Sequence, residues 1–324
     1  MPNSRLKQTE LTSQRSIASG ITSKWPRSPG VGMALFSGFL VLLFLPSLRE
    51  LLLYSLNSDL CSYIPLIPFV SGYLIWLKKE KLRGLQDRSP LAALLALTTG
   101  AGILLTYWIL VGEGWQVSRN DKLTLMMSAF LSLLLGGGFL FLGAGVMRVI
   151  AFPAGMLFFM APLPTFLISW VSSFLQHASA EAGYAMLSLV GEPILRRGLI
   201  FQLAGITIRV AEECSGIHSS LVLFITSLLA GYLFLRAPWK RAVLTLAVIP
   251  LAILRNGLRI FTIAMLCVHV DPAMIDSPIH HRGGPIFFIL SLVPFLALLF
   301  ILRRPERPKN RAASAISGSP AKNP

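Results

Sequence analysis

Cys214 lies where a polar, acidic stretch passes into an apolar one. Residues 209–220 read RVAEECSGIHSS, and the ten that follow, LVLFITSLLA, are apolar enough for a membrane interior. A helix that begins here has first-turn N–H groups without partners and a partial positive charge, which stabilise a thiolate. Ser215 and Gly216 keep that end small enough for a peptide backbone to approach. Cysteine is also often buried as a small apolar residue, so the position alone allows a nucleophile or a filler.

A later apolar stretch contains two arginines. Residues 251–266 read LAILRNGLRIFTIAML, with Arg255, Asn256 and Arg259 inside otherwise apolar sequence. Charges within a span are costly and normally face a cavity or a partner. Arg255 and Arg259 are four residues apart and therefore share one helical face. The alternative is that these long side chains reach the lipid headgroups.

A third polar element precedes the last apolar segment. Residues 277–290 read SPIHHRGGPIFFIL, and Gly284 and Pro285 form a tight turn into a helix. His280 and His281 are of the residue type best suited to exchange a proton near neutral pH. Histidines at a surface are usually inert. A thiol, an arginine and a histidine at one membrane face, however, are the parts that nucleophilic catalysis needs.

The composition is that of an integral membrane protein. The 324 residues are 54% hydrophobic and 13% charged, with a mean hydropathy of +0.68, whereas soluble domains carry about 25% charged residues. Much of the net charge of +15 lies in clusters that flank apolar segments. Such clusters set topology and contact anionic lipids, so they do not indicate nucleic acid. The clusters are the first 27 residues, KKEKLR at 78–83, APWKR at 237–241 and RRPERPKNR at 303–311.

We predict an all-α polytopic membrane protein. About 20 apolar residues cross the hydrocarbon core, and eight segments meet this length loosely. They are 32–54, 62–77, 91–112, 123–144, 146–163, 215–235, 242–265 and 285–302. The transmembrane domain then covers 31–303, between an N-terminal tail (1–30) and a basic C-terminal tail (304–324), both expected to be disordered and cytoplasmic. The late start of the first apolar run indicates a retained anchor and not a cleaved signal peptide.

Lys and Arg near the span ends predict the orientation. With the N-terminus in the cytoplasm, the basic clusters fall inside, residues 112–121 fall outside, and Cys214 lies at the outer end of the sixth span. Arg196 and Arg197 depart from this rule. They indicate either an error in the topology or a functional external loop.

Residues 165–190 have helical length but a polar middle, with Ser172, Ser173, Gln176, His177, Ser179 and Glu181. A lipid-facing helix would not tolerate these side chains, and a single crossing here would change the side of Cys214. We therefore predict an amphipathic helix on, or re-entering, the outer leaflet. Partial alternation and turn glycines over 191–212 predict a short extracytoplasmic β-hairpin that leads to Cys214.

The three cysteines are too few for a disulfide framework. Cys61 and Cys267 would pair only if they lay at the same membrane face. Cys214 would then be the free thiol.

The three polar elements together resemble the exosortase/archaeosortase family of multi-spanning cysteine transpeptidases. The family pattern is Cys-Ser-Gly after Val-Ala-Glu, then Asn-x-x-Arg, then a His followed four residues on by Gly. Here it is matched by Cys214-Ser215-Gly216, by Asn256 to Arg259, and by His280 with Gly284. The resemblance covers roughly residues 60 to 302. Arg209 stands where such sequences often have an acidic residue.

The resemblance implies a bacterial inner-membrane enzyme that cleaves exported proteins ending in a PEP-CTERM-like tail. Such a tail has a Pro-containing motif, one transmembrane helix and basic residues. The implied roles are Cys214 as nucleophile forming a thioester, Arg259 as oxyanion stabiliser and His280 as general acid and base. Glu212 (or Glu213), Asn256, Arg255 and His281 are candidate supporting residues, and no cofactor or metal is implied.

Two other classes of function remain open at this stage. A transporter or channel would use Arg255 and Arg259 to bind an anionic solute midway through the membrane, but leaves Cys214 and the histidines unexplained. A metal-dependent intramembrane enzyme would use Cys214, His218, His280 and His281 as ligands. His218 follows Cys214 by four residues, which is a plausible ligand spacing on a helix.

Overall fold

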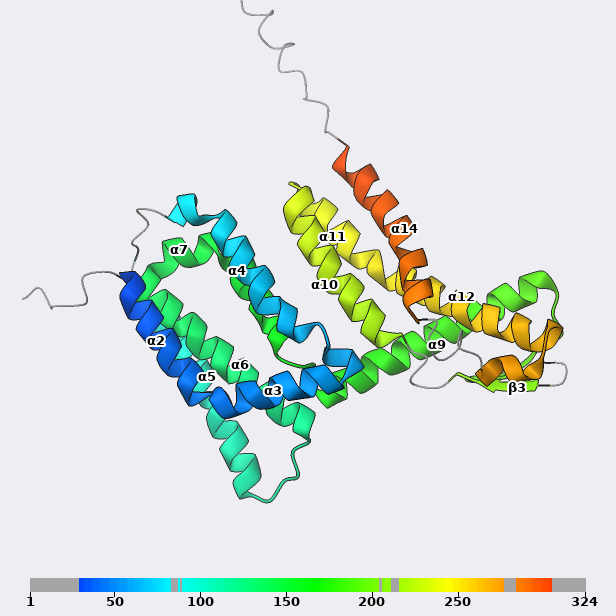
Figure 1. The fold of residues 1–324 in the computed structure, drawn as a ribbon, viewed down its shortest axis with the longest axis horizontal. Helices are drawn as coiled ribbons and strands as arrows, with labels where there is room; N and C mark the ends of the chain where they lie inside the picture. The colour runs from blue at the N-terminus through cyan, green and yellow to red at the C-terminus, as the bar shows by residue number, and fades with distance from the viewer. Residues whose placement is uncertain are drawn as a thin grey trace, which may run out of the picture. The chain divides into compact units, whose positions relative to one another are not determined.

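The computed structural model is almost wholly helical, with one small sheet (Figure 1). It describes residues 29–82, 87, 89–203, 206–210, 216–276 and 284–304. Both tails that the sequence predicts to be disordered fall outside these residues, apart from their innermost positions. The chain divides into two compact units, 1–165 and 166–324, which are described separately.

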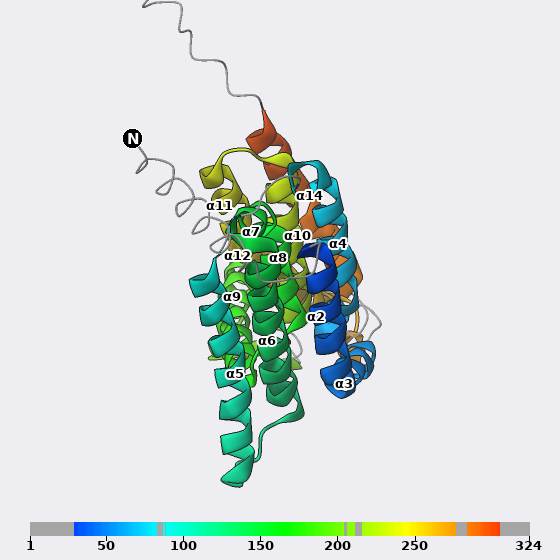
Figure 2. The ribbon, with the colours of Figure 1, turned by 90° about the vertical axis from the view of Figure 1, so that its left-hand side faces the viewer.

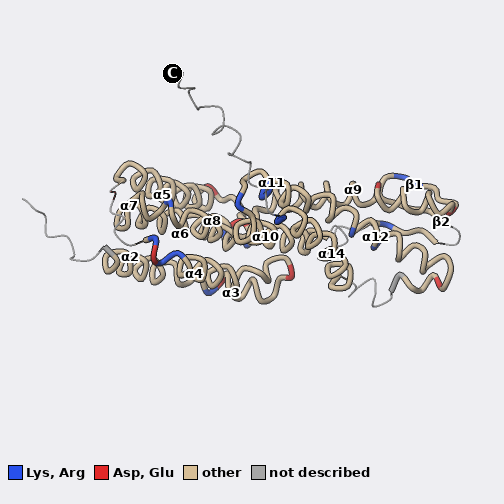
Figure 3. The backbone as a smooth tube through the Cα atoms, turned by 90° about the horizontal axis from the view of Figure 1, so that it is seen from above, with Lys and Arg blue, Asp and Glu red and all other residues tan. Residues whose placement is uncertain are grey.

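The helices have the length and composition of membrane spans. Among the described residues, six are long and apolar enough to cross a bilayer, and the number rises to eight if each of two bent helix pairs is one span. Figure 3 shows that charged residues are sparse along the backbone tube. The prediction of a polytopic helical membrane protein with about eight spans is confirmed.

The first unit consists of helices with short 3₁₀ and π-helical segments between them. The α-helices are α2 (Pro29–Leu43), α3 (Leu45–Asn57), α4 (Ile67–Leu77), α5 (Pro90–Gly112), α6 (Arg119–Gly137), α7 (Gly143–Val149) and α8 (Ala151–Met156). The short segments are η1 (Asp59–Cys61), η2 (Ile64–Leu66), η3 (Lys79–Leu82), η4 (Gly138–Leu142) and η5 (Leu157–Met160). Helix α6 supplies much of the core, because Leu123 and Met127 on it are fully buried against α2, α3 and η1.

Glycines let α5 and α6 pack closely as an antiparallel pair (Figure 2). A Cβ atom added at Gly100 would lie 2.7 Å from Leu133, and one added at Gly136 would lie 2.7 Å from Leu97. Small residues at such crossings let the two backbones approach closely. The resulting van der Waals packing holds helices together in lipid, where no hydrophobic effect acts between them.

Helical segments of the first unit are interrupted where the sequence contains proline. Helices α2 and α3 meet at 69°, and Pro46 in the first turn of α3 cannot continue the preceding helix. The predicted span 146–163 is not one helix. The chain is instead divided there among α7, α8 and η5, and Pro162 and Pro164 follow η5.

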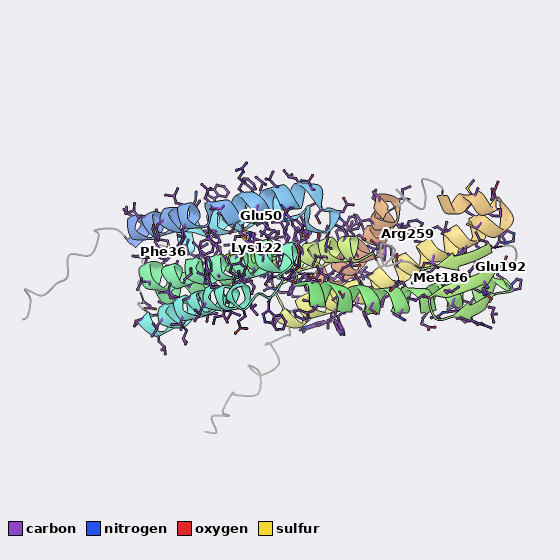
Figure 4. The ribbon with its side chains drawn as sticks, turned by 90° about the horizontal axis from the view of Figure 1, so that it is seen from below. Phe36, Glu50, Lys122, Met186, Glu192 and Arg259 are labelled. Atoms are coloured by element: carbon purple, nitrogen blue, oxygen red, sulfur yellow. The ribbon has the colours of Figure 1, made fainter. Side chains whose placement is uncertain are left out.

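Polar contacts close the two ends of the first unit. At one end the Lys78 ammonium donates to Val149 O at 2.6 Å, and Ala144 N donates to Asp87 O at 2.8 Å. At the other end Glu50 pairs with Arg119 and with Lys122, at 3.1 and 2.8 Å (Figure 4). The basic segment 78–82 thus lies at the opposite end from the loop that precedes α6.

The second unit consists of long helices and the sheet. Its elements are α9 (Thr165–Val190), β1 (Leu195–Arg197), β2 (Ile200–Leu203), β3 (Ile206–Arg209), α10 (Ile217–Phe234), α11 (Pro238–Leu246), α12 (Val248–His269), η7 (Pro272–Asp276) and α14 (Gly284–Arg303).

The sheet has three antiparallel strands in the order β1-β2-β3, so the predicted hairpin is present and is extended by one further strand. Gly198, with φ +63°, makes the first turn. Phe201 and Ile208 are buried against α9 and the second half of α12. A three-residue strand such as β1 carries too little alternation to be recognised from sequence alone.

Helix α9 has the bounds that the sequence predicts. Half of the polar residues in its middle are buried inside the protein. Ser172, Gln176 and Ser179 are buried inside the protein, at 7%, 6% and 0% exposure. A Cβ atom at Gly257 of α12 would lie 2.6 Å from the Ala182 side chain, so the two helices are in backbone contact. Ser173, His177 and Glu181 are exposed, so the polar residues of α9 divide between a face packed inside the protein and an exposed face. The location of α9 in the outer leaflet stays a prediction.

Arg196 has a structural role that explains its departure from the charge rule. Its guanidinium pairs with Glu181 of α9 at 2.7 Å and lies over the rings of Tyr184 and Phe201. The Arg196 side chain is only 15% exposed. It fastens the sheet to α9.

Cys61 and Cys267 do not form the disulfide that the sequence left open. Both are buried and neither is in a disulfide; Cys61 lies in the first unit and Cys267 in the second.

Candidate active site

Helix α12 carries the polar residues that the sequence singles out in its membrane segment. Arg255 and Asn256 are buried, at 7% and 2% exposure, and Arg259 is half-buried. Three charged or amide side chains on one turn of an apolar helix require polar partners. Those of Arg255 lie on α10.

The Arg255 guanidinium binds the first turn of α10. Its Nη2 donates to Gly216 O at 3.1 Å and to Ser220 Oγ at 3.2 Å. Gly216 is the N-cap residue of α10 and has φ +68°. A Cβ atom at Gly216 would lie 2.7 Å from Arg255 Nη2. Only glycine therefore satisfies both the backbone conformation and the close approach.

The Gly216 carbonyl also accepts from α10 itself. Its other donors are Ser220 N at 3.0 Å, Ser219 Oγ at 3.1 Å and Ser220 Oγ at 2.8 Å. These bonds fix where α10 begins and how its first turn is oriented. The first-turn N–H groups that have no intrahelical acceptor then concentrate positive potential at this end.

Helices α10 and α14 are neighbours that run in the same direction (Figure 1). Where they end, the Arg303 guanidinium lies 5.7 Å from the centre of the Phe234 ring. The helices have 18 and 20 residues, or about 27 and 30 Å. Their N-termini, at Gly216 and Gly284, therefore lie at the same end of the second unit, the end at which Arg255 meets α10.

Arg259 lies one turn beyond Arg255, about 6 Å further along α12. Since α12 is antiparallel to α10, this step leads past the first turn of α10, which Arg255 binds. Figure 4 shows Arg259 partway along the second unit, with Glu192 at its far end. The two arginines thus differ in position. Arg255 binds the first turn of α10, and Arg259 lies one turn further along α12.

The remaining predicted site residues are outside the described part of the chain. Cys214 and Glu212 fall in 211–215, directly before Gly216, and His280 and His281 fall in 277–283, directly before Gly284. Of their described neighbours, Gly216 is bound by Arg255, and Gly284 lies at the same end of the second unit.

The sequence matches the family model for transmembrane exosortases over residues 55–297. The chain belongs to the transmembrane exosortase family. Neither a search of curated proteins nor a search of solved structures gave a match. An exosortase is a membrane peptidase or transpeptidase that acts on exported proteins with sorting signals, and the matched region includes all three motifs. Membership thus favours this class of enzyme over a transporter.

The structure of this exosortase adds a residue to which the sequence assigned no role. The Gln176 side chain of α9 donates to Val210 O at 2.7 Å, with both groups buried. Val210 follows β3 and directly precedes the segment that contains Cys214. The sequence signal for a role of Gln176 is its amide in the middle of a helix with apolar ends, where a polar side chain needs a partner. Its partner is 34 residues away, which no local pattern reveals.

A metal-dependent enzyme would need ligands from four candidate residues, and the structure describes one of them. Of Cys214, His218, His280 and His281, only His218 lies in the described part of this exosortase, in the first turn of α10. Its Nδ1 is buried and makes no hydrogen bond to a described residue. Among the described residues no three side chains of the metal-binding types form a group.

Proposed function

We propose that this exosortase is a cysteine transpeptidase that cleaves C-terminal sorting signals through a thioester on Cys214. The observation that carries the proposal is the bond from Arg255 to Gly216 O. Cys214 precedes Gly216 by two residues, and two residues of chain span at most about 7 Å. Cys214 is therefore within that distance of the residue that Arg255 binds. The first turn of α10 supplies the positive potential that a thiolate requires.

The first step is attack of the Cys214 thiolate on the carbonyl carbon of the scissile peptide bond. The tetrahedral intermediate carries an oxyanion, which the Arg259 guanidinium stabilises as a fixed cation in a site of low polarity. Collapse breaks the C–N bond and leaves the acyl group on sulfur as a thioester. His280 donates a proton to the departing amine.

The second step transfers the acyl group. His280, now neutral, removes a proton from the acceptor nucleophile, which attacks the thioester and releases Cys214 as a thiolate. Asn256 and Glu212 are assigned supporting roles in orienting the reacting groups. Arg255 acts through the start of α10, and His281 is a neighbour of the general acid.

The proposed substrates are exported proteins that end in a Pro-containing motif, one transmembrane helix and basic residues. A scissile bond just outside such an anchor would reach Cys214 while its helix stays in the bilayer. In a bacterial inner membrane with both termini in the cytoplasm, the catalytic residues face the extracytoplasmic side. Basic residues at the opposite ends of α10 and α14 from Gly216 and Gly284 support this orientation.

The test is cleavage of a reporter protein with such a tail in cells that make the enzyme. Wild-type enzyme should shorten the reporter on an immunoblot, and Cys214→Ala should leave it intact while accumulating in the membrane to the same level. Thiol alkylation should stop cleavage and a chelator should not. Full cleavage by Cys214→Ala would overturn the nucleophile, and loss with the chelator would favour the metal enzyme.

A further inference from the structure

Buried hydrogen bonds hold both ends of the segment that contains Cys214. On one side Gln176 Nε2 donates to Val210 O at 2.7 Å. On the other side Arg255 Nη2 donates to Gly216 O at 3.1 Å. Only residues 211–215 lie between these two carbonyl groups.

The contact of Gln176 is specific to this place in the fold. Gln176 and Val210 are 6% and 3% exposed, and a buried amide is costly unless it is hydrogen-bonded. Val210 N donates to Leu199 O at 2.9 Å. Both backbone groups of Val210 are thus bonded, one to α9 and the other to the turn before β2.

The helices that carry the two anchors pack against each other. Helix α9 contacts α12 at Gly183, where an added Cβ atom would lie 3.0 Å from Ile260. Arg255 is on the same helix as Ile260. The two anchors therefore belong to helices in direct contact with each other, so the positions of Val210 O and Gly216 O depend on the packing of α9 on α12.

We propose that Gln176 is a positioning residue for Cys214, and that Gln176 and Arg255 are the two anchors of segment 211–215. The proposal rests on the proposed function, because it requires Cys214 to be the nucleophile. A nucleophile gains rate only when it is held in near-attack geometry, and a shift of about 1 Å can cost on the order of a hundred-fold. Gln176 sets this geometry through the backbone of Val210, without touching the substrate.

The first experiment compares Gln176→Met with Gln202→Met. Methionine has similar length to glutamine but cannot donate, and Gln202 is an exposed glutamine on β2. Gln176→Met should cleave the reporter about ten- to a hundred-fold more slowly, mainly in kcat, and Gln202→Met should match wild type. Gln176→Asn keeps a donor on a shorter side chain and should recover part of the lost rate.

A second readout separates positioning from general loss of structure. The rate of alkylation of the Cys214 peptide, followed by mass spectrometry against pH, reports the thiolate. In Gln176→Met its midpoint should move to higher pH, because the sulfur shifts relative to the helix N-terminus. Cleavage at the wild-type rate, or a lost rate with an unchanged alkylation profile that Gln176→Asn does not improve, would contradict the proposal.

The two anchors should also be coupled. If Gln176 and Arg255 act through the same segment, Gln176→Met with Arg255→Met should lose less rate than the product of the two single losses. Multiplicative losses would contradict a shared segment. Cleavage by Cys214→Ala would overturn the proposed function itself. An inactive Cys214→Ala with an active Gln176→Met would overturn only the positioning role.

Discussion

At the scale of single residues, the two arginines of α12 have separate tasks. Arg255 is buried and donates from Nη2 to two acceptors of α10, and its Nη1 has no partner among the described residues. Arg259, one turn further on, is less buried than Arg255. The sequence identified both arginines and preferred Arg259 for chemistry. It could not predict that Arg255 binds Gly216.

Arg259→Lys should be strongly impaired although the charge is kept. A guanidinium offers a planar fork of donors that an ammonium lacks, and removal of one oxyanion donor costs about a hundred- to a thousand-fold in rate. Arg255→Lys should lose less, because an ammonium can still donate to Gly216 O. Reporter cleavage under initial-rate conditions measures both. An inactive Arg255→Lys beside a normal Arg259→Lys would mean that the site is shifted by one turn.

Gly216→Ala should impair both stability and activity. The substitution forces an L-residue into a left-handed conformation, which costs roughly 1–2 kcal/mol, and places a methyl group 2.7 Å from Arg255 Nη2. Gly198→Ala is the matched control, since Gly198 also has positive φ but no atom within 4 Å of the added Cβ. Thermal unfolding in detergent should show a loss in both variants. Reporter cleavage should fall only in Gly216→Ala, and equal activity of the two variants would argue against a role for the Arg255 contact.

His280→Ala should abolish cleavage, and His281→Ala should largely preserve it. Adjacent side chains cannot both point at one sulfur, because they face opposite ways in a strand and diverge by about 100° in a helix. The spacing to Gly284 matches the family pattern from His280. Reporter cleavage by the two variants, at matched protein levels, decides between them. The reverse result would move the general acid by one residue.

At the scale of elements, local signals predict where helices lie but not what they pack against. The length of the segment predicts the bounds of α9. Length and hydropathy together predict the spans that form α10, α12 and α14. The polar middle of α9 predicts an amphipathic helix on, or re-entering, the outer leaflet. In the structure Gln176 and Ser179 face the protein interior, whereas His177 and Glu181 are exposed. A polar residue shows that a partner exists, and only the tertiary structure identifies that partner.

The contact between α9 and α12 should be sensitive to a single methyl group. In Gly257→Ala the new Cβ would lie 2.6 Å from the Ala182 side chain and 3.2 Å from Gly183 N. Such overpacking costs about 1–3 kcal/mol. Gly102→Ala is the control, since nothing lies within 4 Å of its added Cβ. The midpoint of thermal unfolding should fall for Gly257→Ala and not for Gly102→Ala, and equal midpoints would contradict backbone contact between the helices.

At the scale of the whole molecule, each unit has at one end the basic residues that the charge rule places in the cytoplasm. In the first unit Lys78 and its neighbours lie at one end, opposite the Glu50–Lys122 pair. In the second unit Arg241 donates to Leu235 O, and Arg303 lies over Phe234, at the end opposite Gly216. The charge rule anticipated both groupings. It did not anticipate Arg196, whose charge is used in an ion pair and ring contacts that keep it from acting as a topology signal.

The orientation of both units can be tested by labelling single cysteines in a Cys214→Ala background, where the remaining Cys61 and Cys267 are buried. Gly114 is in the loop before α6, and Lys240 is in the first turn of α11 at the basic end of the second unit. If basic ends face the cytoplasm, a membrane-impermeant maleimide added to spheroplasts should label Gly114→Cys and not Lys240→Cys. Both should react after the membrane is permeabilised, which shows that each thiol is accessible.

Labelling of Lys240→Cys in intact spheroplasts would invert the second unit, and the site at Gly216 would then face the cytoplasm, where it would not meet an exported substrate. Failure to label Gly114→Cys until permeabilisation would invert the first unit. The intervening segment 165–216 would then have to cross the membrane once, and α9 would be the span.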